Sequence, residues 1–180
     1  MSIVLHGVAA GKGIAIGHAH LITRGAAEVP QYDIDPDKLE AEVARFDNAI
    51  KATRKELEQL RGAIPENAPT ELGAFISLHL MLLTDVTLSR EPIDILREQK
   101  INAEWALKQQ SDKLAAQFDS IDDDYLRERK QDMLQVVRRI HNNLVGQSNE
   151  INLAGNLFDD TVLIVHDLSP ADTVLFKEQH

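Results

Sequence analysis

The residues best suited to chemistry in this chain are its histidines, because the sequence has seven of them and no cysteine. The lack of cysteine excludes disulfides, thiol catalysis and thiolate metal sites. His18 and His20 lie two apart in a predicted strand, so their side chains point to one face, and His6 is close by in sequence. Three imidazoles could bind zinc or nickel, but no acidic ligand stands at a suitable spacing. We therefore expect solvent-facing histidines here and no metal site.

A glycine-rich segment near the N-terminus contains Gly11-Lys12-Gly13, which invites comparison with a phosphate-binding loop. The pattern GxxxxGK[ST] is absent, and these glycines precede a strand instead of opening a helix. A tight turn into the strand is the simpler interpretation.

The acidic run 122–124 falls in the first turn of a predicted helix, where the helix dipole favours negative charge. It lacks the alternating ligands and the glycine of a calcium loop. No serine–histidine–acid order stands out, so the residues by themselves predict no self-contained active site.

His79 stands in an apolar part of a predicted helix, between Leu78 and Leu83. One interpretation is a partly buried histidine that is bonded to a neighbouring helix. The other is a surface for a protein partner, because Met81 and Leu82 follow and flexible methionine and leucine suit such surfaces. Another histidine, at position 141, lies among arginines and asparagines and is expected to be exposed.

These residues must be positioned by a long helical middle segment that runs roughly from Asp35 to Gly146. Asp35 can cap the first helix and Pro36 suits its first position, while Gly62 and the prolines beyond it end that helix. Between them, apolar residues alternate by four and three, which predicts one buried or paired face. The members of this face are Leu39, Val43, Phe46, Ile50, Thr53, Leu57 and Leu60.

Four further helices are predicted in this middle segment. One extends from about Thr70 to Ser89 and a short one from Pro92 to about Glu98. Asn102 can cap the next helix, and Ser120 can cap the last one, with Asp123 at the capping-box position. Short connections between helices of this length predict an antiparallel bundle.

Strand-like apolar runs flank the helical segment at residues 3–5, 14–22 and 161–165. A second cap–proline–acid pattern predicts a helix from Ser169 to about Glu178, after the last strand. This order indicates an α+β fold that is mostly helical. An antiparallel helical bundle is inserted into an α/β subdomain that looks incomplete.

The 180 residues suffice for one ordinary domain or two small subdomains. We expect residues 1–32 and 147–180 to form the α/β part and residues 33–146 the helical part. The net charge of −10 argues against nucleic acid as a partner and favours a basic partner protein. The competing interpretation is that the acidic residues serve only to keep the chain soluble. No apolar run approaches the roughly 20 residues of a membrane span, and the start lacks a signal-peptide pattern. A cytoplasmic protein without a membrane segment is the expectation.

Four segments, in order along the chain, resemble the N-terminal region of Enzyme I of the sugar phosphotransferase system (phosphoenolpyruvate–protein phosphotransferase). GVAAGKGIAIGHAHL (7–21) is similar to the family's opening, although the family usually has Ser-Pro where this chain has Gly-Lys. HLMLLTD (79–85) is similar to the family's histidine-x-Met-Leu-Leu-x-Asp segment. DDDYLRERKQDM (122–133) resembles its Asp-x-Tyr-Leu-x-Glu-Arg-x-x-Asp helix. TVLIVHDLSPADT (161–173) resembles its strand followed by Asp-Leu-x-Pro-Ser-x-Thr.

The resemblance implies a phosphotransfer mechanism and a swivelling, phosphohistidine-type α/β subdomain. Enzyme I takes a phosphoryl group from phosphoenolpyruvate, with magnesium, onto a histidine, and passes it to the small phosphocarrier protein HPr. The family's phosphorylated histidine follows a glycine-rich loop that nothing here matches, so the role is not carried onto His180. The barrel that binds phosphoenolpyruvate and magnesium is also missing. We therefore expect a truncated chain that docks HPr, holds no catalytic residue and no metal, and is not phosphorylated alone.

By the same resemblance, HPr docks on the inserted helical subdomain. Apolar anchors would supply the affinity and acidic groups would steer a basic partner. The family tends to carry several acidic residues after the position of Leu83, where this chain has Val86 and Thr87. The residues implied for this surface are Met81, Leu82, Leu88, Phe118, Leu126 and Arg129, with His79 and Asp85 at its edge.

Two other functions compete with carrier docking. A pure interaction module would dimerise through the apolar face of the first helix, Leu39 to Leu60. A relative such as pyruvate phosphate dikinase would share the swivelling subdomain, but the resemblance to that enzyme does not include the helical insertion.

Enzyme I dimerises through a C-terminal domain, so we expect a monomer, or a weak dimer through an exposed sheet edge.

Overall fold

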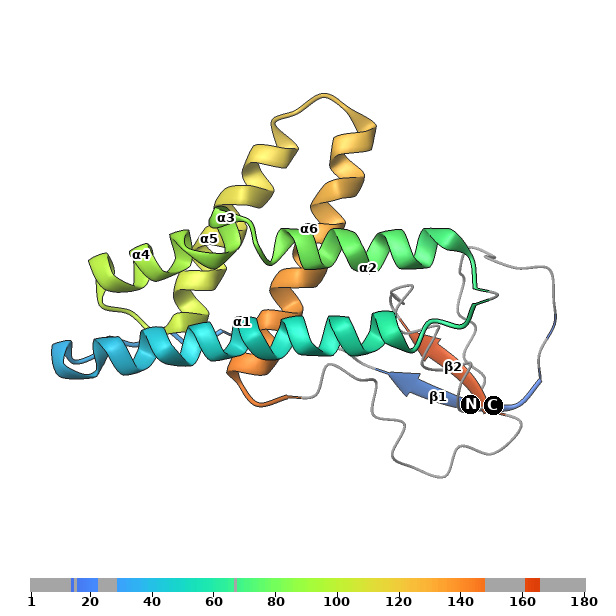
Figure 1. Cartoon of the computed structure of the whole chain (residues 1–180), viewed down its shortest axis with the longest axis horizontal. Coiled ribbons are helices and arrows are strands. Elements are labelled where there is room, and N and C mark those ends of the chain that lie inside the picture. The colour runs from blue at the N-terminus through green and yellow to red at the C-terminus, as the bar shows by residue number, and fades with distance from the viewer. Residues whose placement is uncertain (1–13, 15, 23–28, 67, 148–160, 166–180) are drawn as a thin grey trace, which may run out of the picture. The chain divides into compact units, whose positions relative to one another are not determined.

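The computed structural model describes residues 14, 16–22, 29–66, 68–147 and 161–165 of the 180 (Figure 1). The chain divides into two compact units, one that contains the strands and one that contains the helices. The predicted strand at residues 3–5 and the predicted helix from Ser169 to Glu178 lie outside the described residues. Each unit is described by itself below.

The strand-bearing unit contains β1 (His18–Ile22) and β2 (Thr161–Val165), which pair in parallel with His18 opposite Thr161 and Ile22 opposite Val165. Parallel strands need a crossover connection, and here the whole helical segment lies between them in sequence. The prediction that both flanking segments contribute to one sheet is therefore confirmed. The predicted strand 14–22 was too long, since pairing begins only at His18.

The first long helix begins with a 3₁₀ turn, η1 (Pro36–Lys38), and continues as α1 (Leu39–Gly62). Asp35 precedes the turn but makes no capping hydrogen bond, and its carboxylate instead accepts from Lys38 Nζ at 3.0 Å. The predicted apolar face is confirmed: its five central members are buried and its two end members pack against the same core. That face is covered by the chain's own helices, so it offers no seam for dimerisation.

The predicted helix from Thr70 to Ser89 is in fact two helices, α2 (Thr70–Leu82) and α3 (Val86–Ser89). The interruption has a local cause, because the Asp85 side chain caps α3 by accepting from Thr87 N at 2.9 Å. A further helix, α4 (Glu91–Gln99), follows at once with a proline at its start, as predicted.

The last two helices, α5 (Ala103–Asp119) and α6 (Asp124–Leu144), form an antiparallel pair joined by a short loop (Figure 1). Ser120 does not cap α6 as predicted. It is the last residue of α5's C-terminal turn, and its hydroxyl donates to Gln117 O at 2.7 Å. Gly146 follows the end of α6 with φ +68°, and Gln147 N donates to Asn142 O at 2.8 Å, which is a glycine-based helix stop.

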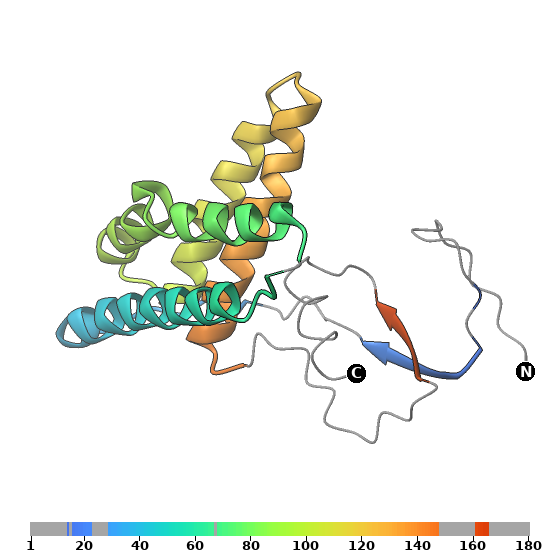
Figure 2. The same cartoon turned by 45° about the vertical axis from the view of Figure 1, so that its right-hand side comes forward.

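Figure 2 shows that α1 and α2 lie side by side and that α5 and α6 cross them, so the bundle consists of two antiparallel pairs in layers. A single apolar core joins all of these helices, and its most buried members include Phe46, Leu57, Ile76, Leu96 and Ile140. Within the part of the chain that is described, no helix alone has the length and hydropathy of a membrane span. Only α2 taken together with the α3–α4 segment reaches that length and hydropathy, and the two are bent by 61° relative to each other.

Candidate functional site

The predicted docking residues lie on α2, α3, α5 and α6, and the packing of α2 on α6 and of α3 on α5 makes these helices neighbours. Met81, near the end of α2, is 61% exposed, and Val86, at the start of α3, is equally exposed. Leu82 between them is half-buried and packs against the core. The end of α2 and the start of α3 therefore present two large apolar side chains to solvent.

Asp85 lies between these two apolar residues and is exposed. Its carboxylate accepts from Thr87 N at 2.9 Å and from the Thr87 hydroxyl at 2.8 Å. Asp85 thus has a structural role as the cap of α3 and remains exposed to solvent.

The other predicted docking residues differ from one another in their exposure. Leu88 is buried in the core at 1% exposure, which contradicts a surface position. Phe118 on α5 is half-buried against the core, and Arg129 on α6 is half-buried and pairs with Asp132 at 3.2 Å between Nη1 and Oδ2. Leu126 lies in α6, but its side chain is outside the described set.

His79 lies inside the helical unit, not at an edge, since it is only 1% exposed. It stands two residues before Met81, and residues two apart point to nearly opposite sides of a helix. Its ring meets that of Phe75, one turn earlier, at 4.1 Å between centroids. Among the described residues, neither ring nitrogen has a hydrogen-bond partner. Burial, together with the positive charge of Arg139, lowers the pKa of His79 from 6.5 to about 4.

A second buried polar site, which the sequence did not predict, joins α1 to α5. Arg45 donates from Nη1 to Glu104 Oε1 and from Nη2 to Glu104 Oε2, both at 2.7 Å. It also holds Glu42, one turn before it on α1, through Nε at 3.0 Å and Nη2 at 2.6 Å. We call Glu42, Arg45, Asn102 and Glu104 the polar network.

Asn102 completes the polar network with a role other than the predicted one. It precedes α5, but its side chain does not cap that helix. Its amide nitrogen donates to Glu104 Oε2 at 2.9 Å, and Glu42 from α1 accepts from Ala103 N at 2.8 Å in place of a cap. The spacing of Glu42 and Arg45 predicts a helix-surface pair, but nothing in the sequence links them to Glu104, 59 residues after Arg45.

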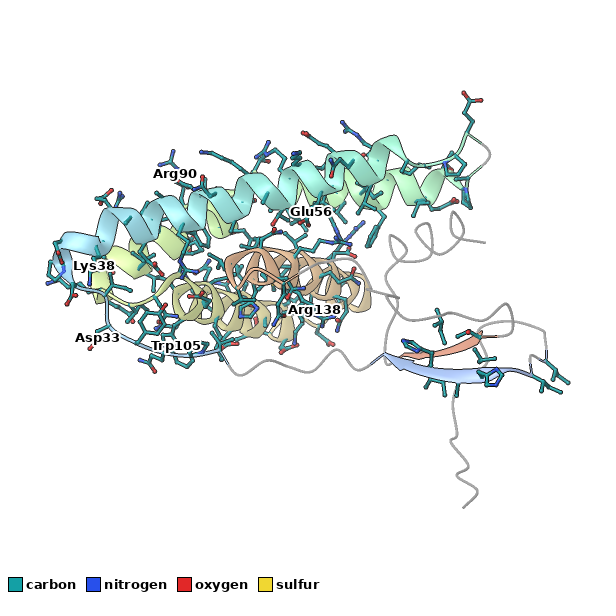
Figure 3. All side chains as sticks on the ribbon, turned by 90° about the horizontal axis from the view of Figure 1, so that it is seen from below. Asp33, Lys38, Glu56, Arg90, Trp105 and Arg138 are labelled. Carbon is teal, nitrogen blue, oxygen red and sulfur yellow. The ribbon has the colours of Figure 1, made fainter. Side chains whose placement is uncertain are left out.

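The Glu104 carboxylate and the Arg45 guanidinium of this network remain charged. Burial by itself would raise the pKa of Glu104, but hydrogen bonds from Arg45 and Asn102 outweigh it and lower the pKa to about 2. Hydrogen bonds to Glu104 and Glu42 raise the pKa of Arg45 above its ordinary value. Asp33, just before η1, forms an isolated antiparallel bridge with Ile101, and Figure 3 labels Asp33 and the α5 residue Trp105 among the side chains of the helical unit.

No metal centre is indicated by the residues that the structure describes, since no three histidine, aspartate or glutamate side chains lie close enough to share an ion. His18 and His20 on β1 are both exposed, as predicted. His141, predicted to be exposed, is half-buried on α6.

The chain matches the family model described as PEP-utilising enzyme, N-terminal, over residues 6–129. It is 42% identical, over 98% of its length, to the phosphoenolpyruvate-protein phosphotransferase of Cupriavidus necator, and covers 31% of that protein. It is 34% identical to the enzyme of the same name from Bacillus subtilis, over 97% of this chain and 30% of the relative. The chain thus spans about a third of the length of these relatives.

Solved structures give the same relationship. An NMR solution structure of Enzyme I superimposes with a TM-score of 0.75 at 33% identity, and the match covers 93% of this chain and 67% of that one. The N-terminal domain of Enzyme 1 – Nitrogen has the same fold, with a TM-score of 0.66 at 24% identity, over 90% of this chain and 65% of that one. On this evidence, the chain belongs to the PEP-utilising enzyme family and carries that family's N-terminal domain.

Proposed function

We propose that the chain is the N-terminal part of a phosphoenolpyruvate–protein phosphotransferase and that its helical unit docks the phosphocarrier protein HPr. The observation that carries this proposal is the exposed apolar surface formed by Met81 and Val86. Relatives with this name align with nearly the whole chain, which supports the same function.

The surface has the chemistry of a protein-docking site. Methionine adapts its flexible side chain to a partner, and exposed apolar anchors at the centre of an interface supply most of its affinity. Asp85 lies between the two apolar residues, and the α5–α6 loop adds the exposed Asp122 and Asp123. With a chain charge of −10, these carboxylates favour encounter with a basic carrier.

In the proposed reaction, the parent enzyme takes a phosphoryl group from phosphoenolpyruvate, with magnesium, onto a histidine and passes it to HPr. We place no step of that chemistry on a residue of this chain, and His180 is not assigned the transfer. Residues 33–146 are proposed to dock HPr, while residues 1–32 and 147–180 belong to the α/β subdomain. A cytoplasmic location and the lack of phosphorylation of the 180 residues alone remain predictions.

An NMR titration of the labelled chain with unphosphorylated HPr tests the proposal. We expect saturable shifts around Met81, Val86 and Arg129, and weaker binding at higher salt because exposed charges are screened. Met81→Ala should weaken binding about tenfold, since it removes an exposed apolar anchor. Val145→Ala is the matched control, because it shortens an exposed apolar side chain just beyond α6, outside the proposed surface.

The same titration can overturn the proposal. If the folded chain shows no saturable shifts, carrier docking is wrong. If Met81→Ala and Val145→Ala weaken binding equally, the carrier binds elsewhere on the helical unit.

A further inference from the structure

Met81 is the one sulfur-containing side chain of the proposed docking surface, and the chain has no cysteine that could react with an oxidant in its place. Val86, the other large exposed apolar residue of that surface, has a purely hydrocarbon side chain. We propose that Met81 is a site of reversible oxidation by peroxides and that its sulfoxide weakens docking of the carrier. The effect on docking rests on the proposed function, whereas the oxidation itself does not.

Two methionines lie in the part of the chain that the structure describes, and they differ in exposure. Met81 is 61% exposed near the end of α2, whereas Met133 on α6 is 3% exposed and belongs to the apolar core. A peroxide in solution must reach the thioether sulfur before it can react, so susceptibility follows exposure. Met81 should therefore react in the folded chain, and Met133 only when the core opens.

The reaction needs only the thioether and the peroxide. The sulfur of Met81 donates an electron pair to one oxygen of hydrogen peroxide, an S–O bond forms and the O–O bond breaks. The sulfur is oxidised by two electrons to the sulfoxide, and the second peroxide oxygen is reduced and leaves as water with both protons. Methionine sulfoxide reductases reverse the change with a dithiol, which becomes a disulfide while the sulfoxide oxygen leaves as water.

The end of α2 has a main-chain structure that does not depend on the Met81 side chain. The Met81 carbonyl accepts from Thr84 N at 2.9 Å and from the Thr84 hydroxyl at 2.7 Å. In the free chain, the sulfoxide oxygen on the exposed side chain hydrogen-bonds to water. At an interface it must lose that water, and the apolar contact of the thioether is lost as well. Oxidation of Met81 is therefore expected to weaken docking and to leave the fold intact.

Peptide mapping by mass spectrometry after treatment of the folded chain with hydrogen peroxide tests the site. Trypsin cleaves after lysine and arginine, so Met81 falls in the peptide between Arg61 and Arg90, separate from the peptides of Met1 and Met133. The Met81 peptide should gain one oxygen while the Met133 peptide stays unmodified. In chain unfolded by urea, both peptides should gain oxygen, which shows that the fold causes the difference.

The NMR titration with HPr, after catalase has removed the peroxide, measures the consequence for docking. The affinity of the treated chain should fall about tenfold, as for Met81→Ala. Methionine sulfoxide reductases A and B with dithiothreitol should restore it, since each reduces one epimer of the sulfoxide. The urea midpoint of the treated chain should not change.

Two variants show which sulfur is responsible. Met133→Leu conserves the volume of a core side chain and retains Met81, so it should lose affinity on treatment as the parent chain does. Met81→Leu lacks the reactive sulfur but retains Met1 and Met133. Its affinity for HPr should therefore be the same before and after peroxide.

Equal oxidation of Met81 and Met133 in the folded chain would contradict the proposal. So would an unchanged affinity of the oxidised parent chain, or a loss in Met81→Leu as large as that in the parent. Failure of the untreated chain to bind HPr would instead refute the proposed docking function, and the peptide masses would still decide whether Met81 is the site of oxidation.

Discussion

His79 and Glu104 are both buried in the helical unit, yet the structure keeps one neutral and the other charged. His79 has an aromatic neighbour and no hydrogen-bond partner among the described residues, so burial removes its charge. Glu104 accepts from Arg45 and Asn102, so it keeps its charge at almost the same degree of exposure. Partners, and not burial alone, decide the ionisation state of a buried group. The comparison also predicts that substitutions and acid change the free energy of unfolding differently at the two sites.

The largest expected effect comes from breaking the paired site. Glu104→Ala removes the main partner of Arg45 and a partner of Asn102, and leaves a partly buried guanidinium with only Glu42 and the Leu144 carbonyl as partners. Because the Arg45 side chain is about a third exposed, we expect a loss near the lower end for buried pairs, about 3 kcal/mol. Urea unfolding followed by the fluorescence of Trp105 measures it. The surface variant Asp112→Asn, which removes an exposed pair with Lys108, should change stability by less than about 0.5 kcal/mol.

Acid is expected to have an intermediate effect on the free energy of unfolding, and the two sites should respond to it in different pH ranges. The pKa of His79 is lowered from 6.5 to about 4, so the fold prefers its neutral form. The resulting stabilisation is complete above pH 6.5 and is lost as pH falls towards 4. At pH 5 the free energy of unfolding should therefore be lower by about 2 kcal/mol than at neutral pH.

Glu104 also loses its contribution to stability as pH falls, but in a lower pH range. Its pKa is lowered from 4.5 to about 2, so its contribution is present above pH 4.5 and is lost as pH falls from 4.5 to 2. Unfolding measured between pH 6.5 and 5 thus reports on His79 and not on Glu104. In His79→Leu the decline in that range should disappear. If it persists, another histidine is responsible.

The smallest effect is expected at neutral pH for the same variant. His79→Leu replaces two buried nitrogens, which have no hydrogen-bond partner in the described part of the chain, by an apolar side chain of similar size. We expect a gain of about 1 kcal/mol at pH 7.5, because an unsatisfied buried polar group costs stability. A loss of stability in the urea experiment would show that the imidazole makes a favourable contact, and the contrast between the two sites would then be wrong.

Much of the fold was predictable because it depends on local patterns. The apolar face of α1 and the stop at Gly62 follow from the spacing of residues along one helix. The start of α4 at a proline and the end of α6 at Gly146 follow from local stop and start signals. The same reasoning failed at two places. Ser120 ends α5 instead of capping α6. Within residues 70–89, the Asp85 side chain caps α3 and so divides the predicted single helix into two.

The docking surface was predictable only in part. Met81 is exposed as expected, whereas His79 and Leu88 are buried. Their burial depends on the side of α2 that meets α1 and α6, and on the packing of α3 against α5. Since α2 is apolar on nearly every side, its sequence has little periodicity from which to predict the buried side.

The amino-acid sequence by itself determined the helical middle segment, the two strands that pair across it and the family to which the chain belongs, because each depends on patterns that neighbouring residues carry. Only the tertiary structure decided which polar residues meet. Arg45 lies on α1, whereas Asn102 directly precedes α5 and Glu104 lies in its first turn, and the hydrogen bonds between Arg45 and Glu104 form when α1 and α5 pack together. The physical reason is that helix periodicity specifies which face is apolar, whereas the partner of a buried charge depends on the crossing of two helices.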